Sequence, residues 1–222
     1  MALGTPRSLV SLAGMVALGL SGAGAQSPTA EDVARALEFH YKHARTLEAD
    51  FVQRYTLGAQ TLVESGHVYF QKPGRMRWDY DRPPGKFFLT DGRYAYLHLP
   101  VEKQIRRQPV KKAGHYQAAF ALLLGKAELE RLFGRLEVVR VHRLDTPARW
   151  QLRGDARSDK QPFTQVWLDL NDRFQLLRVE IRQRDGSLME FHFRRWRENH
   201  ALRAELFDPR VPPGTAWLEE VP

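Results

Sequence analysis

The chain has 222 residues, of which 34 are lysine or arginine and 26 are aspartate or glutamate, and it contains no cysteine. Its hydrophobic content of 43% and aromatic content of 11% are typical of a folded protein rather than a disordered one. The lack of cysteine excludes disulfides, thiolate metal sites, a cysteine nucleophile and a lipid attached through cysteine. The formal net charge of +8 favours an anionic partner without identifying it.

The first 25 residues have the pattern of a signal peptide. Arg7 is the only charged residue before Glu31, and a mostly apolar run follows it at positions 8–20. This run would reach about 20 Å as a helix, which is short of the ~30 Å hydrocarbon core of a bilayer. Ala23-Gly24-Ala25 supplies the small residues that a signal peptidase accepts. We therefore expect cleavage after residue 25, export, and a mature chain 26–222 that forms one domain.

A helix is predicted to open the mature chain. Thr29 can cap its first turn, and Asp32 lies at the third helical position, where it can complete a capping box. Apolar residues then recur at steps of three and four from Val33 to Ala44, which places them on one face. The pattern predicts an amphipathic helix that ends around residues 45–47.

Alternating polar and apolar residues predict strands in the rest of the chain. The predicted strands are 51–55, 62–70, 75–80, 87–89, 94–97, 104–109, 136–142, 149–153, 164–170, 174–183 and 188–196. Asp91-Gly92 and Asp185-Gly186 predict two tight hairpins, because Asp-Gly is a strong signal for a two-residue turn. Between the sixth and seventh strands, residues 116–124 and 126–133 predict two short helical segments.

An antiparallel sheet of about eleven strands has to curve and be covered in order to bury one of its faces. Met76, Trp78 and Tyr80 share one face of their predicted strand, whereas the polar residues between them share the other. Phe191 and Phe193 repeat this pattern. We expect an α+β fold, mainly antiparallel β, in which a half-open curved sheet or incomplete barrel carries a lid formed by the predicted helices.

Local motifs give no support to an enzyme. The sequence has no nucleotide-binding loop, G-x-S-x-G elbow or H-E-x-x-H motif. His40 and His43 have a spacing that could ligate a metal, but local spacing supplies no third ligand, so surface histidines are the favoured interpretation. Asp79 and Asp81 share a strand face like a catalytic pair, but neighbouring arginines favour structural ion pairs. We expect no metal site, no cofactor and no enzymatic activity.

Arginine-rich segments such as 178–184 and 194–197 contain the combination of cations and aromatic residues that can bind single-stranded nucleic acid. The export signal argues against this partner, because nucleic acid is uncommon outside the cytoplasm. We therefore expect no nucleic acid to bind.

One ordered set of motifs resembles a known family. The sequence is FVQ at 51–53, GHVYFQKPGRMRWDY at 66–80, PPG at 83–85 and LTDGRYAYL at 89–97. A later F-x-x-x-x-PPG at 207–214 completes the set. Together these motifs resemble the periplasmic lipoprotein carrier family, LolA.

The resemblance implies a half-open antiparallel barrel whose mouth is covered by helices. It also implies a periplasmic chaperone, expected to act as a monomer, that binds the acyl chains of lipoproteins. The implied partners are acylated lipoproteins, an inner-membrane ABC transporter complex that releases them and an outer-membrane receptor lipoprotein that accepts them. Two alternatives stay open: a regulatory protein of the same fold that senses lipid or lipoprotein, and an exported hydrolase with a dispersed site.

Candidate residues for the acyl-chain cavity are chosen by their strand or helix face, and each could equally belong to an ordinary core. They are Phe51, Phe70, Met76, Trp78, Leu89, Tyr96, Phe120, Leu123, Phe191 and Phe193. Lys72 falls where the family typically has an arginine, and the resemblance implies that this arginine closes the cavity through hydrogen bonds to the lid backbone. Lysine keeps the charge but lacks the planar, many-donor guanidinium. A solvated basic residue beside a turn is the alternative for Lys72.

Overall fold

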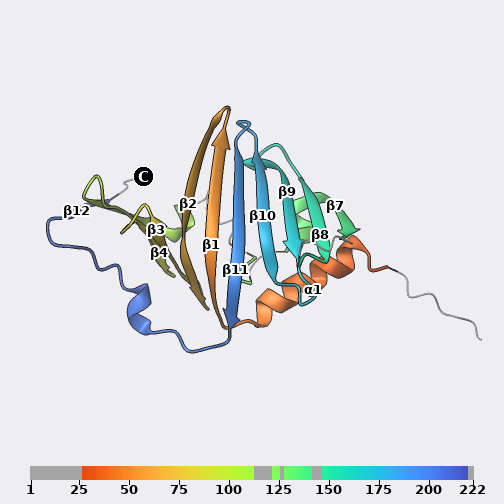
Figure 1. Ribbon diagram of the computed structural model, residues 1–222, viewed down its shortest axis with the longest axis horizontal. Coiled ribbons are helices and arrows are strands. Elements are labelled where there is room, and N and C mark those ends of the chain that lie inside the picture. Colours follow the sequence, from red (N-terminus) through yellow and green to blue (C-terminus); the bar gives the residue numbers. More distant parts are fainter. Residues whose placement is uncertain (1–26, 113–121, 126–127, 142–146, 220–222) are drawn as a thin grey trace, which may run out of the picture.

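The computed structural model describes residues 27–112, 122–125, 128–141 and 147–219. Within these ranges the main element is one sheet of twelve strands (Figure 1). The strands are β1 (Thr46–Leu57), β2 (Gln60–Gln71), β3 (Arg75–Arg82), β4 (Phe87–Asp91), β5 (Tyr94–Leu99), β6 (Gln104–Pro109), β7 (Phe133–Arg140), β8 (Trp150–Ala156), β9 (Phe163–Leu170), β10 (Leu176–Gln183), β11 (Leu188–Glu198) and β12 (Ala216–Glu219). The helical elements are α1 (Ala30–His43), α3 (Leu129–Leu132) and the 3-10 turns η1 (Val110–Lys112) and η2 (Ala204–Phe207).

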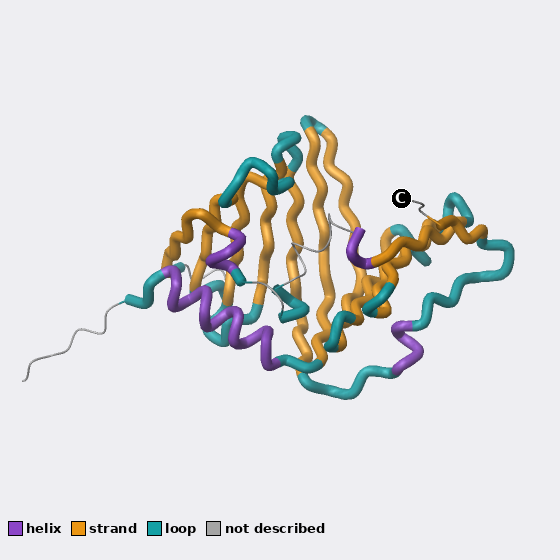
Figure 2. Tube along the Cα trace, turned by 180° about the vertical axis from the view of Figure 1, so that it is seen from behind, coloured by secondary structure: helices purple, strands orange, loops and turns teal. Residues whose placement is uncertain are grey.

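The sheet is open, with β12 at one edge and β7 at the other. Its strand order is β12-β6-β5-β4-β3-β2-β1-β11-β10-β9-β8-β7, so β1 and β11 join the two halves of the sheet. Neighbouring strands are antiparallel except for β12, which pairs with β6 in parallel. Figure 2 shows α1 lying across the half formed by β7–β11, on the side that we call the inner face. The predicted α+β class, with a half-open, mainly antiparallel sheet and a helical cover, is confirmed.

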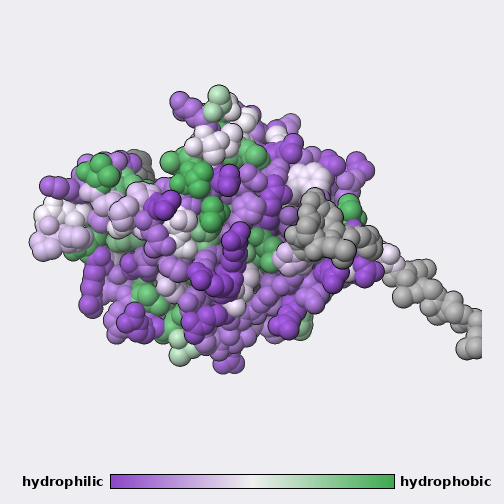
Figure 3. Space-filling view, viewed as in Figure 1, coloured by the Kyte–Doolittle hydropathy of each residue, from purple (hydrophilic) through white to green (hydrophobic). Residues whose placement is uncertain are grey.

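Alternation along the strands separates an apolar inner face from a charged outer face. On β3, Met76, Trp78 and Tyr80 are all buried, as their spacing predicts. On the outer face of β10 and β11, Arg178 donates to Glu190 at 2.8 Å as part of a row of ion pairs. Figure 3, drawn from the side opposite to Figure 2, is accordingly mostly hydrophilic in colour.

Helix α1 begins at the predicted capping box. The Thr29 hydroxyl accepts from the Asp32 N–H at 3.2 Å, and the Asp32 carboxylate accepts from the Thr29 N–H at 3.0 Å. The apolar stripe, which includes Val33, Leu37 and Tyr41, is buried against the sheet. The helix ends at His43, and β1 already begins at Thr46, earlier than predicted, because the strand pairs with both β2 and β11 along most of its length.

Tyr41 links α1 to β10. The side chain is fully buried, and its hydroxyl oxygen accepts a hydrogen bond from the Leu176 N–H at 2.9 Å. Burial also raises the pKa of Tyr41 far above its ordinary value of 10, so the hydroxyl stays protonated.

Tyr41→Phe is expected to lower the free energy of unfolding by about 1 kcal/mol, because the Leu176 N–H then lies in the core without its acceptor. Urea unfolding measures the change. Tyr55→Phe is a suitable control, since Tyr55 is only half-buried, near the end of β1. A Tyr41→Phe protein as stable as the wild type would contradict this role of the hydroxyl.

The helical region between β6 and β7 is only partly described. Of the predicted helix 116–124, residues 116–121 lie outside the described residues, and 122–124 form a turn. In the predicted helix 126–133, residues 126 and 127 also lie outside the described residues, α3 covers Leu129–Leu132, and Phe133 already begins β7. The predicted signal peptide, residues 1–25, also lies outside the described residues.

A twelfth strand, which the sequence pattern does not predict, follows from the path of the C-terminal segment. This segment crosses the outer face of β3 and β4, where the Arg77 guanidinium donates to the Leu206 carbonyl at 3.0 Å and Phe207 is buried. It ends in β12, whose Glu219 pairs with Arg107 of β6 at 2.6 Å. Four residues with an exposed side-chain pattern carry little strand signal of their own.

His192, on the outer face, is expected to make the stability of the protein depend on pH. Burial, with Arg178, Arg54 and Arg194 nearby, lowers the pKa of His192 from 6.5, against an opposing effect of Glu190. The unfolded chain therefore binds more protons between the lowered pKa and 6.5, and stability rises with pH in that range. We expect the wild type to lose stability relative to His192→Gln as the pH falls from about 7 to about 5. Denaturant unfolding at several pH values tests this, and identical pH profiles of the two proteins would contradict it.

Candidate functional site

Five aromatic rings form the centre of the inner face, and we call them the inner aromatic cluster. Trp78 has ring-centroid distances of 4.7 Å to Phe51, 5.5 Å to Phe191, 6.1 Å to Phe70 and 6.1 Å to Phe193. Most of these contacts are edge-to-face, the arrangement that aromatic quadrupoles favour. Each of the five residues is 1–2% exposed. Four strands thus contribute rings to one continuous apolar surface.

Strand register explains why these rings meet. Phe51 of β1 is directly opposite Phe193 of β11, and Gln53 of β1 is opposite Phe191. On β3, Trp78 is opposite Val68 of β2, a buried inner-face residue. Because side chains on one face repeat every two residues, pairing in this register directs all the rings to the side that α1 covers.

Two further predicted cavity residues belong to the same apolar region, and a third lies outside the described residues. Met76 and Leu123 are 3% and 1% exposed and belong to the same apolar cluster as Trp78 and Phe51. Phe120 lies outside the described residues.

Leu89 and Tyr96 do not join the inner aromatic cluster, which corrects the face assigned to them. Leu89 is opposite Arg77, whereas its neighbour Phe88 is opposite Trp78, so Leu89 lies on the outer face. Tyr96 is opposite Leu89 and shares that face. Both belong to a separate buried cluster with Phe87 and Ile105, which Val211 of the C-terminal segment packs against. The alternation was misleading here because β4 is buried on both faces.

Lys72, at the end of β2, contacts the backbone at the C-terminal end of α1. Its Nζ donates to the carbonyl oxygens of Tyr41 and Lys42, the second at 2.9 Å. The last carbonyls of a helix have no partner within the helix, and a cation near them is also favoured by the helix dipole. Lys72 therefore connects the helical cover to the sheet, at the position where the family resemblance implies a lid contact.

The surroundings of Lys72 are close-packed. Gly125 lies so near that a Cβ atom there would be 2.6 Å from the Lys72 Nζ and 3.0 Å from the Tyr41 carbonyl oxygen. Gly125 also has a φ of +67°, which favours glycine. Burial lowers the pKa of Lys72 from 10.5.

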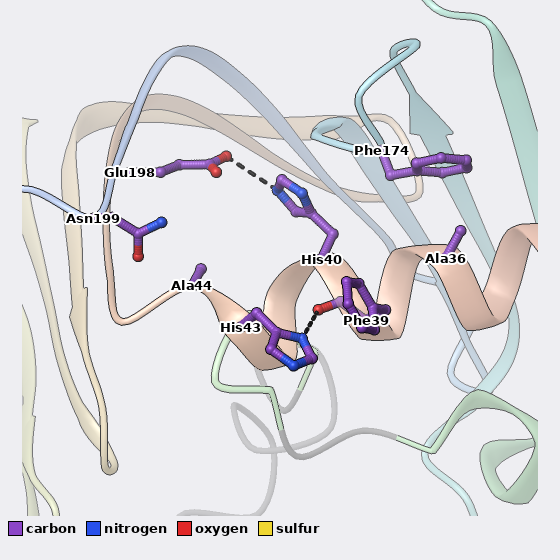
Figure 4. A pocket seen from close by; sticks show the side chains of 8 residues that line it. All are labelled: Ala36, Phe39, His40, His43, Ala44, Phe174, Glu198 and Asn199. Atoms are coloured by element: carbon purple, nitrogen blue, oxygen red, sulfur yellow. Dashed lines mark hydrogen bonds and ion pairs between the residues drawn. The ribbon is translucent and has the colours of Figure 1, made fainter.

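A second feature, on the outward side of α1, is a groove of about 380 Å³ between the helix, Phe174 and the end of β11. Figure 4 shows that the two helix histidines point to different partners in it. His40 lies 3.1 Å from Glu198, and His43 Nδ1 donates to the Phe39 carbonyl at 2.8 Å. Within the described part of the chain, no group of three or more His, Asp or Glu side chains is arranged to hold a metal ion.

The Asp79–Asp81 pair has structural partners. Asp79 accepts from the Arg77 Nε at 2.7 Å, which confirms the predicted ion pair with an arginine. Asp81 instead lies 3.7 Å from the imidazole of His67, a partner that the sequence pattern did not indicate.

Sequence reasoning missed a small polar group on the inner face, formed by Gln53, Glu64, Lys86 and Tyr80. Lys86 donates to Glu64 at 2.5 Å, and Tyr80 donates to Gln53 at 3.4 Å. The only signal in the sequence is that Gln53 and Glu64 interrupt apolar positions of β1 and β2. Their proximity depends on the register of those two strands, which places Gln53 opposite Glu64.

Among the residues that the structure describes, no helix has both the length and the apolarity needed to cross a bilayer.

Comparison with known proteins agrees with the motifs. A family model described as outer membrane lipoprotein carrier protein LolA matches residues 42–210. A protein of Methylobacillus flagellatus named outer-membrane lipoprotein carrier protein is 27% identical over 191 residues, covering 85% of this chain and 90% of its own. A protein of the same name from Nitrosospira multiformis is 27% identical over 188 residues, covering 83% and 87%.

The fold also matches a solved structure. The crystal structure of an uncharacterized conserved protein from Thermus thermophilus superposes with a TM-score of 0.54 at 15% identity, covering 86% of this chain and 98% of the other. At that identity the likeness concerns the fold alone. The family match, in contrast, spans most of the chain, from the end of α1 to beyond η2. The chain therefore belongs to the LolA family of outer membrane lipoprotein carrier proteins.

Proposed function

We propose that this protein is a periplasmic carrier that binds the acyl chains of lipoproteins on its inner face. It accepts its cargo from an inner-membrane ABC transporter complex and delivers it, as a monomer, to an outer-membrane receptor lipoprotein. The observation that carries the proposal is the inner aromatic cluster on the inner face, in a chain of the LolA family. The names of the relatives support a carrier of outer-membrane lipoproteins.

The inner face has the chemistry that such cargo needs. Each methylene removed from water contributes about 0.8 kcal/mol, so a chain of about fifteen methylenes costs on the order of 12 kcal/mol to expose. Aromatic and aliphatic side chains offer an apolar surface without the directional contacts that would restrict it to one chain length. Met76, on the same face of β3 as Trp78, adds a flexible side chain, which favours adaptable packing.

The rings of the inner aromatic cluster are almost fully buried, so the cover of the inner face, of which α1 is a part, must move before the cluster can receive a ligand. Lys72 is the connection between β2 and the end of this helix. We propose that Lys72 holds α1 closed in the empty protein and that cargo binding releases it. Carriage of this kind forms and breaks no covalent bond, so the proposed function requires neither catalysis nor a cofactor.

The direct test compares one lipoprotein in two forms. The delipidated carrier is mixed with a purified acylated lipoprotein or with the same protein lacking its acyl chains, and complexes are measured by co-purification. We expect a complex with the acylated form only. Equal binding of both forms would contradict the proposed function.

The direction of transport requires a cellular test. Depletion of the protein in its native host is expected to leave outer-membrane lipoproteins in the inner membrane or the periplasm. Membrane fractionation measures their distribution. An unchanged distribution after depletion would contradict the proposed carrier role between the two membranes.

A further inference from the structure

The polar group of the inner face contains an ion pair between a buried carboxylate and a largely buried ammonium, whose side chain is 19% exposed. Glu64 is 5% exposed, and Lys86 donates to it at 2.5 Å. The Lys86 ammonium also lies 4.4 Å from the centroid of the Tyr80 ring. Burying two charges costs free energy that their mutual attraction often fails to recover, so such a pair is weak evidence for a purely stabilising role.

This polar group directly borders the inner aromatic cluster. Gln53 follows Phe51 at the next inner-face position of β1, and Glu64 is opposite Gln53. Tyr80 lies with its ring centroid 5.2 Å from that of Phe51. Lys86 comes from the turn after β3, where its carbonyl accepts from the Tyr80 N–H at 3.0 Å. The apolar surface therefore ends at a fixed set of hydrogen-bonding groups.

Beyond this polar group, the β1–β2 hairpin extends past the end of β3. Ser65 is the last residue of β2 that has a partner on β3, so among the described strands residues 60–64 pair with β1 alone. Leu57 and Leu62 of the extension are 50% and 58% exposed. In Figure 2 the hairpin projects beyond the neighbouring strands at the upper end of the sheet. The polar group thus lies at the transition between the buried apolar surface and the solvent-exposed end.

We propose that Lys86 and Glu64 bind the polar linkage of the acylated N-terminus, meaning the ester and amide groups that join the acyl chains to the peptide. This inference rests on the proposed function. An ammonium has three donors, of which one is directed to Glu64, and ester carbonyl oxygens are acceptors. Glu64 has Lys86 as its hydrogen-bond partner, and its second oxygen can accept the amide N–H. The Lys86 ammonium can thus donate to an ester carbonyl while the neighbouring Glu64 carboxylate accepts from the amide N–H.

The test compares two synthetic peptides with the same N-terminal cysteine and the same two C16 chains. In one the chains are attached through esters, and in the other through ethers, which lack the carbonyl acceptors. An unacylated peptide is the third probe. We expect the wild type to bind the ester peptide about tenfold more tightly than the ether peptide, as for one charge-assisted hydrogen bond, by isothermal titration calorimetry.

The double variant E64Q/K86M removes both charges together and so leaves neither one buried without its partner. It is expected to bind the ether peptide within about twofold of the wild type and to lose the preference for the ester. R153M/D155N is the matched control, because this half-buried pair, at 3.0 Å, belongs to β8 and lies away from the inner aromatic cluster. The control is expected to keep the tenfold preference.

Three outcomes contradict the proposal. The first is equal affinity of the wild type for the ester and ether peptides, which needs no variant and leaves the proposed carrier function intact. The second is a preference for the ester that persists in E64Q/K86M. The third is a wild type that binds both acylated peptides no better than the unacylated one, and this outcome also contradicts the proposed function.

Discussion

Replacement of Trp78 by alanine is expected to lower the free energy of unfolding by about 3–5 kcal/mol. Trp78 is 1% exposed, and its ring contacts the other four members of the inner aromatic cluster. Its removal leaves a cavity between strands that are fixed by their hydrogen bonds, so the site can close only in part. Denaturant unfolding, with the midpoint and slope reported separately, measures the loss.

Trp167→Ala is the matched control for Trp78→Ala. Trp167 lies between the buried Val166 and Leu168 of β9, so its half-buried side chain is on the outer face, where Arg153 lies 5.5 Å from the ring centroid. The control is expected to cost clearly less than Trp78→Ala, because solvent can fill the space that it leaves. A cost at Trp78 no larger than at Trp167 would show that the inner aromatic cluster is not the tightly packed centre of the sheet.

The sequence predicted the structure best where a single local pattern, such as alternation along a strand or an Asp-Gly turn, determines the outcome. Met76, Trp78 and Tyr80 alternate with charged residues, and burial of one face follows directly from that pattern. The two Asp-Gly hairpins form where predicted, since Gly92 and Gly186 have φ values of +98° and +83°, which a glycine adopts without strain. Such features can be predicted from neighbouring residues alone, without knowledge of distant contacts.

Prediction was wrong where distant segments decide which face is buried. Leu89 and Tyr96 are buried by the C-terminal segment, whose Val211 lies more than a hundred positions away, and not by the inner face. The strand β12 depends in the same way on its pairing with β6. Alternation predicts that two faces differ, but it does not identify what covers each face.

For the candidate site, the family resemblance supplied what the residues alone could not. The motif around Lys72 implied a lid contact, and the structure places its ammonium on carbonyl oxygens of α1, about thirty positions earlier in the chain. The polar group around Glu64 and Lys86 had no such motif. Its members become neighbours only through the register of β1 and β2 and the turn after β3.

Lys72→Met is expected to lower the free energy of unfolding by about 2 kcal/mol, because two carbonyl groups at the end of α1 lose a charged donor. The amides in the last turn of α1 are expected to exchange with deuterium about thirtyfold faster. A change of about thirtyfold corresponds to about 2 kcal/mol when these amides exchange through local opening of the helix. If Lys72 also holds α1 closed, an acyl-chain probe should exchange faster in this variant. Hydrogen-exchange mass spectrometry and probe release measure these effects.

Two further variants separate the hydrogen bonds from the charge. Lys42→Met removes a cation from the same helix end but leaves the Lys42 carbonyl and its bond to Lys72 in place, so its amide exchange should stay close to that of the wild type. Lys72→Arg keeps the charge and adds donors, so the amides in the last turn of α1 should retain most of their protection from exchange. Some loss is expected because Gly125 leaves little space beside the side chain. Equal acceleration in Lys72→Met and Lys42→Met would mean that charge at the helix end, rather than these two hydrogen bonds, holds α1 on the sheet.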